Sequence, residues 1–333
     1  MDQMIRSKLW LKAGAVASGL TLVALVTVGV VGGAATAAAS AATPLVGTFG
    51  ITAGTFSGGI PAGSYFRMLI PGGTLNGPSA TNYFANPDST ASDQTYTLLS
   101  PGTQGGLITG AYQAAPDPAF DGAGNSLAAG IIAPVAFAGP NFSVETQTPD
   151  AQTSTAVPTP TISDAGGKLT GSLQAFSASW NTQYFNQGSP KPDGSSPGVT
   201  AGPTGKYTAS TGAYSLTWTS EIVGGPFNGF TGQWVLTGTF KVGAPTITTT
   251  SLPDATPGTA YSAVTLAATG GVAPYKWKVS SGTLPAGLKL SSKGVLSGTP
   301  KKTDAAGADP ITVEATSHKS TATATKPFTL TVT

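Results

Sequence analysis

The chain has 333 residues, of which 40% are hydrophobic and only 9% are charged, and its formal net charge is +2. This length allows two domains, and the 45 glycines and 26 prolines interrupt the sequence too often for long helices. The absence of cysteine excludes disulfides, thiol catalysis and cysteine-bound metals, and the single histidine, His318, has no partner motif for a catalytic triad or a metal site. We therefore expect an all-β protein built from short strands.

The N-terminal segment has the three parts of a secretory signal peptide. Basic residues precede an apolar peak at residues 20–31, and small residues follow as far as an A-x-A site at residues 39–41. We expect residues 1–41 to be a signal peptide that is cleaved before Ala42. The alternative is an uncleaved membrane anchor, because about 20 apolar residues can span a bilayer. In either case the protein is exported, either secreted or held at the cell surface, and contacts a membrane only through this segment if it is uncleaved.

Residues 44–243 predict one all-β domain, either a sandwich or a barrel. The first and last predicted strands contain the similar sequences Leu-Val-Gly-Thr-Phe and Leu-Thr-Gly-Thr-Phe, and we expect these two strands to pair. The stretches 141–163 and 186–205 are rich in turn-forming residues and predict long loops. We find no resemblance to a characterised family in this region. Alternating runs bounded by Gly, Pro, Asn or Asp predict strands at residues 45–51, 64–70, 94–99, 106–112, 169–180, 213–222 and 233–242.

One cluster of side chains in this region is suited to binding a ligand. Residues 180–187 contain three aromatic rings and four side-chain amides. Rings stack on the apolar faces of sugars, and amides both donate and accept hydrogen bonds with hydroxyl groups. The cluster therefore predicts a site for a carbohydrate or a protein. The predicted ligand-binding residues are Trp180, Asn181, Gln183, Tyr184 and Asn186.

The alternative interpretation of this cluster is that its rings belong to the core. Aromatic side chains bury most of their area in folded proteins, and Trp180, Tyr184 and Phe185 stand where a strand enters a loop. Trp218 and Trp234 lie within alternating strands, and we predict that both are core residues.

The acidic residues of the first domain are sparse. A glycoside hydrolase needs a pair of carboxyl groups but no histidine. Most acids here stand in turn sequences such as Asp-Gly and Pro-Asp-Pro, which explains them without catalysis. We predict no catalytic residue and no enzyme, with a carboxylate-dependent polysaccharide hydrolase as the alternative. The candidate carboxyl groups for that alternative are Asp93, Asp117, Asp121, Glu145 and Glu221.

Residues 244–333 predict a second, smaller β-sandwich. Tyr275, Trp277 and Val279 alternate with two lysines and a serine, so the rings fall on one face of a strand and the lysines on the other. The aromatic face predicts the core of a sandwich of about 90 residues. Strands are expected at residues 246–250, 264–268, 275–280, 294–297, 311–316 and 328–333.

This second region resembles the He_PIG family, an immunoglobulin-like (Ig-like) domain of bacterial surface proteins that is related to cadherin-like domains. The resemblance implies a binding or spacer module rather than a catalyst. The motifs that carry it, in order, are Leu252-Pro253, Gly258, Tyr261, Gly270-Gly271, the Pro-Tyr-Lys-Trp sequence at 274–277, the Leu-Pro-Ala-Gly-Leu turn at 284–288, and the Gly-Val-Leu-Ser-Gly-Thr-Pro sequence at 294–300.

The sequence departs from that family at one position that concerns calcium. Related domains often carry an aspartate after the penultimate strand, whereas residues 313–318 contain none. Calcium prefers several carboxylates and carbonyls together, and this region has only four acids. We therefore predict no cofactor and no metal site, with calcium as the alternative. The four acids are Asp254, Asp304, Asp309 and Glu314.

Charge is divided unevenly between the two regions. Residues 42–243 contain five basic and nine acidic residues, whereas residues 244–333 contain eight lysines and four acids. A basic surface on the second region favours anionic envelope polymers, although lysines also serve solubility alone. The lysines are scattered, so no nucleic-acid partner is predicted. We predict an exported adhesion or binding protein whose partner is an extracellular or envelope polysaccharide or a surface protein. The alternative is a secreted polysaccharide hydrolase with an Ig-like accessory module.

Overall fold

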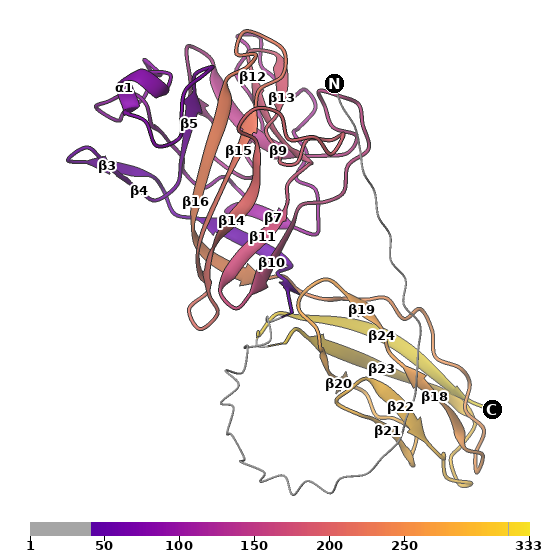
Figure 1. Cartoon of the computed structure of the whole chain (residues 1–333). Helices are drawn as coiled ribbons and strands as arrows, with labels where there is room; N and C mark the ends of the chain where they lie inside the picture. The colour runs from indigo at the N-terminus through magenta and orange to yellow at the C-terminus, as the bar shows by residue number, and fades with distance from the viewer. Residues whose placement is uncertain (1–40, 319) are drawn as a thin grey trace, which may run out of the picture. The chain divides into compact units, whose positions relative to one another are not determined.

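The computed structural model describes residues 41–318 and 320–333 (Figure 1). The predicted signal peptide, residues 1–41, lies outside this range apart from its last residue. The protein is all-β, as predicted, and the described residues contain one short helix, α1 (Ser79–Asn82). Within the described residues, no helix has the length and apolar character needed to cross a membrane.

The first region contains two main sheets and a small hairpin. One sheet has ten strands in the order β1-β10-β11-β14-β15-β16-β2-β7, with β5 added to β16 and β6 added to β5. The second has the order β13-β12-β9-β8, and β3 pairs with β4. The strands are β1 (Thr43–Pro44), β2 (Gly47–Ile51), β3 (Thr55–Ser57), β4 (Ile60–Ala62), β5 (Tyr65–Leu69), β6 (Thr97–Leu98), β7 (Gly106–Thr109), β8 (Val135–Ala136), β9 (Asn141–Thr146), β10 (Thr161–Ala165), β11 (Lys168–Ser172), β12 (Phe176–Trp180), β13 (Gln183–Asn186), β14 (Ala201–Thr208), β15 (Ala213–Glu221) and β16 (Thr231–Val242).

The predicted pairing between the first and last strands of this region is confirmed. Phe49 of β2 lies opposite Phe240 of β16 in an antiparallel ladder, and their rings are 4.7 Å apart. The N-terminal half of β16 pairs instead with β5. The change of partner occurs near Gly238, where a Cβ atom would lie 1.8 Å from the carbonyl oxygen of Gly50. The β2–β16 pair therefore lies in the interior of the large sheet, whose strand order runs from β1 at one end to β7 at the other.

The two sheets of the first region pack through aromatic rings. Phe176 of β12 lies 5.1 Å from both Trp218 and Trp234, which stack on each other at 5.8 Å. Both tryptophans are fully buried, so the prediction that they are core residues is confirmed. Phe66 of β5 also reaches Phe142 of β9 at 5.5 Å. The two sheets therefore pack face to face as a sandwich, and the large sheet is a half-barrel rather than a closed barrel, since its strand order runs from β1 to β7 without closing.

Three of the strand and loop predictions for this region are wrong, and one of them is the predicted loop 186–205, which contains the start of β14. The run 169–180 is not one strand: β11 belongs to the large sheet and β12 to the small one, with a turn closed by a hydrogen bond from Phe176 N to Leu173 O at 2.9 Å. The predicted loop 141–163 contains β9 and the start of β10. The polar residues of β9 concealed this strand in the sequence, because Ser143 and Glu145 alternate with apolar residues but are buried instead of facing water.

The second region has its own core. Its strands form three sheets, β17-β19, β18-β22-β21 and β20-β23-β24, around a cluster of buried residues that includes Trp277, Val313 and Leu330. Tyr275 and Val279 pack against this cluster at partial burial, which confirms the predicted core face. The strands are β17 (Thr246–Ile247), β18 (Tyr261–Thr265), β19 (Ala268–Thr269), β20 (Lys276–Ser281), β21 (Leu288–Leu290), β22 (Val295–Gly298), β23 (Gly307–Thr316) and β24 (Thr323–Val332).

Candidate functional site

The predicted ligand cluster forms a β-hairpin between β12 and β13. Trp180 and Gln183 are the last paired residues of the two strands. Asn181 and Thr182 make the turn, with φ values of 48° and 60°. Positive φ at both central residues is the requirement of a type I′ turn, the two-residue connection that matches the twist of the strands. Asparagine tolerates this conformation because its short side chain bonds locally, so the sequence favours a hairpin here.

The hairpin divides the predicted site between two faces. Side chains alternate along a strand, so Trp180 and Gln183 share one face, while Tyr184 and Asn186 lie on the other. Asn181 stands at the exposed turn. The structure therefore does not bring the five residues together on one surface. Each face of the hairpin has its own surroundings.

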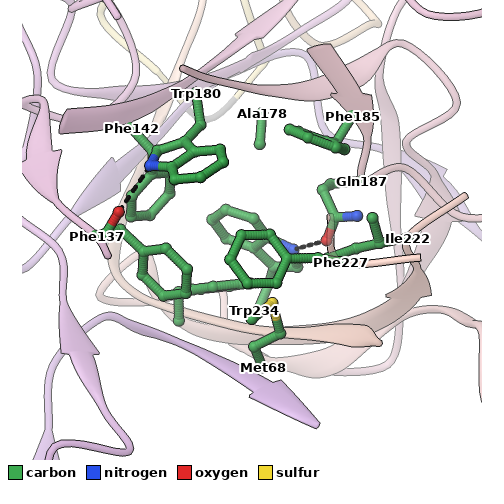
Figure 2. Close-up of a pocket in the computed structure, with 11 residues that line it drawn as sticks. Met68, Phe137, Phe142, Ala178, Trp180, Phe185, Gln187, Ile222, Phe227 and Trp234 are labelled. Carbon is green, nitrogen blue, oxygen red and sulfur yellow. Dashed lines mark hydrogen bonds between the residues drawn. The ribbon is translucent and has the colours of Figure 1, made fainter. Parts of the chain in front are cut away.

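One face of the hairpin borders a pocket lined almost entirely by aromatic and aliphatic side chains (Figure 2). Trp180 lines it from β12, and its Nε1 donates a hydrogen bond to the carbonyl oxygen of Phe137 at 2.6 Å. Phe185 and Gln187 line it from β13 and the residue after it. The cavity measures about 40 Å³. The other lining residues are Phe66, Met68, Phe137, Phe142, Ala178, Ile222, Phe227 and Trp234.

The only polar side chain of the pocket is already engaged. Gln187 Oε1 accepts a hydrogen bond from Trp234 Nε1 at 3.1 Å, and Gln187 Nε2 donates to the carbonyl oxygen of Asn186 at 3.2 Å. The pocket therefore offers mainly dispersion and aromatic contacts. One water needs about 10–15 Å³ of such volume, so the cavity has room for an apolar group of a few atoms, such as a methyl group.

A glycine-rich loop supplies one side of this pocket. The segment 222–230 connects β15 to β16, and Gly224, Gly225 and Gly229 all have positive φ values in it. Phe227 is half-buried and its ring lies 5.3 Å from that of Trp180. Phe227 and Gln187 were not predicted from the sequence to line a pocket. The one sequence feature that indicates this loop is its Gly-Gly-Pro sequence.

The opposite face of the hairpin is polar but buried. Asn186 is only 2% exposed. Its Nδ2 donates to Asp150 Oδ2 at 2.7 Å and to the carbonyl oxygen of Gln174 at 2.8 Å, and its Oδ1 accepts from Gly188 N at 3.1 Å. The Asn186 amide is therefore used inside the protein. Tyr184 is half-buried against Phe120, at a ring separation of 5.3 Å.

A chain of buried hydroxyl groups leads to Glu145 on this face. Ser126 Oγ and Ser179 Oγ are 2.6 Å apart, and Ser179 donates to Glu145 Oε2 at 2.8 Å. Glu145 Oε1 has no partner within the described residues. Burial raises the pKa of Glu145 to about 8, with a smaller contribution from the negative charge of Asp150. This carboxyl group is therefore mostly neutral at pH 7.

Other candidate acids form turns. Asp121 Oδ1 accepts hydrogen bonds from the backbone N–H groups of Ala123 and Asn125, both at 2.9 Å. Asp93 accepts from the backbone and the hydroxyl group of Thr95. In the part of the chain that the structure describes, no group of three His, Asp or Glu residues lies close enough to hold a metal.

The comparisons with known proteins concern the second region. Residues 244–333 match the family model He_PIG, described as "Putative Ig domain", so this part of the chain is an Ig-like domain. Domains of this type are typical of extracellular or surface proteins and suggest an adhesion-type module. No curated protein matches the sequence.

One similar solved structure is the crystal structure of Drosophila N-cadherin EC1-4. It is 16% identical to this chain, with a TM-score of 0.22, and the alignment covers 38% of this chain and 34% of the cadherin chain. The chain thus spans about a third of the length of that protein, and a likeness at this TM-score supports no inference about fold or function.

Proposed function

We propose that the protein is an exported, non-enzymatic surface protein whose Ig-like domain displays the first β-sandwich, and that this sandwich binds an extracellular or envelope polysaccharide. The observation that carries the proposal is the aromatic pocket beside the β12–β13 hairpin in a chain that ends in an Ig-like domain. The He_PIG match supports the display role, and the N-terminal sequence supports export.

The chemistry of the pocket supports a sugar-containing ligand with an apolar substituent. The cavity accepts an apolar group of a few atoms, which fits the methyl of an acetylated sugar. The amides of Asn181 and Gln183 stand at the turn of the hairpin, where they can exchange hydrogen bonds with hydroxyl groups. The partly buried rings of Trp180 and Phe227 beside the cavity offer faces on which sugar C–H groups pack.

The surroundings of the pocket support binding without catalysis. A glycoside hydrolase places two carboxyl groups about 5 to 9.5 Å apart around the scissile bond. The residues that line the aromatic pocket include no Asp or Glu. Glu145 is fully buried on the other face of the sheet and is mostly neutral at pH 7, and the carboxyl groups of Asp93 and Asp121 are engaged in turns.

The test is a binding screen of the mature protein, residues 42–333, against a glycan array, isolated cell-wall polymers and extracellular proteins. Ala178→Val adds two methyl groups that point into the cavity and blocks it without removing a core ring. Trp180→Ala removes one wall. Ile60→Ala is the control, since Ile60 is 70% exposed on β4 and lines no described pocket. Thermal unfolding verifies that each variant is folded.

Saturable polysaccharide binding that is lost in both pocket variants and retained in the control supports the proposal. Binding that survives in both variants but disappears at high salt assigns the site to the lysines of the Ig-like domain and overturns the pocket assignment. Binding to proteins alone, or no binding, overturns the polysaccharide proposal.

A further inference from the structure

A second pocket lies on the other face of β13. Asn186 contributes to this pocket, whereas its neighbours Phe185 and Gln187 line the aromatic one. The second pocket has a cavity volume of about 210 Å³ and is built from segments 152–155, 186–197 and residue Val223. Ligand sites for drug-sized molecules usually measure about 300–1,000 Å³, so this pocket suits a smaller molecule.

A buried ammonium group belongs to this pocket. Lys191 is only 6% exposed. Its Nζ donates to the carbonyl oxygen of Asn186 at 2.8 Å and to Ser220 Oγ at 2.7 Å. An ammonium group has three protons to donate, so these two bonds leave one proton that makes no hydrogen bond among the described residues. Buried lysines are rare unless they are paired, which makes this arrangement a specific feature of the fold.

The rest of the lining offers both hydrogen-bonding groups and apolar walls. Asp193 lines the pocket, and its carboxylate accepts hydrogen bonds from Ser195 N, at 2.9 Å to Oδ1, and from the Ser195 side chain. Each carboxylate oxygen can accept more than one hydrogen bond. The hydroxyl group of Thr155 makes no hydrogen bond among the described residues. Val223 is 49% exposed and, with two prolines, supplies the apolar part of the wall.

The net charge of the groups around the ammonium of Lys191 constrains the charge of the ligand. The carboxylates of Glu221, Asp150 and Asp193 all interact with Lys191. A single cation beside three acids does not attract an anion, because the local charge is negative overall. The ligand expected here is therefore neutral, with several hydroxyl groups that can accept from the ammonium and donate to a carboxylate, and with C–H faces that contact the apolar wall.

We propose that this pocket binds one neutral sugar unit, with the ammonium group of Lys191 and the carboxylate of Asp193 contacting its hydroxyl groups. The inference rests on the proposed function and deepens it, since the sugar would be one unit of the polysaccharide bound by the first sandwich. The aromatic pocket and the sugar pocket then lie on the two faces of the same strand.

The test uses the mature protein and a panel of neutral monosaccharides, N-acetylated hexosamines, uronic acids and non-sugar polyols, with binding followed by NMR titration. Asp193→Asn removes the carboxylate charge, and Thr155→Val removes one hydroxyl group at nearly constant shape. Asp121→Asn is the matched control, because Asp121 also closes an exposed turn but lies outside the pocket.

We expect saturable millimolar binding of at least one neutral sugar, weakened about tenfold by each pocket variant and unchanged by the control. Preference for uronic acids, equal binding of simple polyols, or binding unaffected by both pocket variants would overturn the inference, as would no binding of any monosaccharide. Polymer binding that is lost in Ala178→Val but unaffected by Asp193→Asn would overturn this inference and leave the proposed function standing.

Discussion

Replacing Glu145 with glutamine removes a buried titrating group and keeps its shape. The side chain is fully buried, accepts a hydrogen bond from Ser179 and lies near the charges of Asp150 and Tyr184 when these are ionised. Glutamine retains an oxygen that accepts from Ser179, but it carries no charge at any pH. The variant therefore isolates the effect of ionising Glu145 on stability.

The sign of this effect follows from the direction of the pKa shift. Folding raises the pKa of Glu145 from 4.5 to about 8, so the folded protein favours the neutral form. Its contribution to stability is fully present below pH 4.5, falls as the pH rises towards 8, and changes no further above that pH. At about 1.4 kcal/mol per pH unit, the total loss of stability is on the order of 5 kcal/mol. The free energy of unfolding of an ordinary protein is about 5–15 kcal/mol, so this loss would be a large part of it.

Urea unfolding at a series of pH values measures this loss. We expect the wild-type protein to lose stability relative to Glu145→Gln between pH 5 and 8, with a slope of up to about 1.4 kcal/mol per pH unit. Comparing the two proteins cancels the titration of groups that they share, including those of the Ig-like domain. Parallel stability curves from pH 5 to 8 would refute the reasoning, because they would mean that Glu145 ionises at its ordinary pKa.

Three further substitutions probe packing, each measured by urea unfolding of the full chain. Gly238→Ala places a methyl group 1.8 Å from a carbonyl oxygen of β2 and should cost about 1–3 kcal/mol or more, whereas Gly122→Ala meets nothing within 4 Å and should cost little. Trp277→Ala empties the core of the Ig-like domain and should cost about 3–5 kcal/mol. Lys278→Gln breaks an exposed 3.0 Å ion pair with Glu314 and should change stability by less than about 1 kcal/mol.

Local patterns in the sequence predicted much of the fold. The repeated Gly-Thr-Phe sequences identified the β2–β16 pair, and the alternation around Trp277 identified the core face of the Ig-like domain. The error at 169–180 also had a local signal. Apolar residues stand at odd positions as far as Ala175 and at even positions from Phe176 onward, and such a change of phase marks the point where the chain leaves one sheet for the other.

Strand β9 and the site could not be predicted in the same way, because both depend on distant segments. The sequence suggests that Ser143 and Glu145 face solvent, but both are buried, and Ser143 Oγ donates to the carbonyl oxygen of Ile132 in the segment between β7 and β8. The ligand cluster was assembled from residues that are adjacent in sequence, whereas strand alternation sends Trp180 and Asn186 to opposite faces. Phe227 reaches the aromatic pocket from a loop more than forty residues further along the chain.

Several of the few charged side chains in the first region are buried in its interior. Residues 42–243 contain fourteen charged side chains, and four of them, Arg67, Glu145, Asp150 and Lys191, are buried. Burying an ionisable group is costly unless other groups compensate it, so these positions are specified by the fold rather than by solubility. Three of the four border β13 or its neighbours: Asp150 holds the amide of Asn186, Lys191 holds its carbonyl oxygen, and Glu145 lies on the adjoining strand pair. The buried charged groups thus hold β13 in place through hydrogen bonds, and β13 is the strand that separates the two pockets. The buried charges therefore help to position both proposed binding sites.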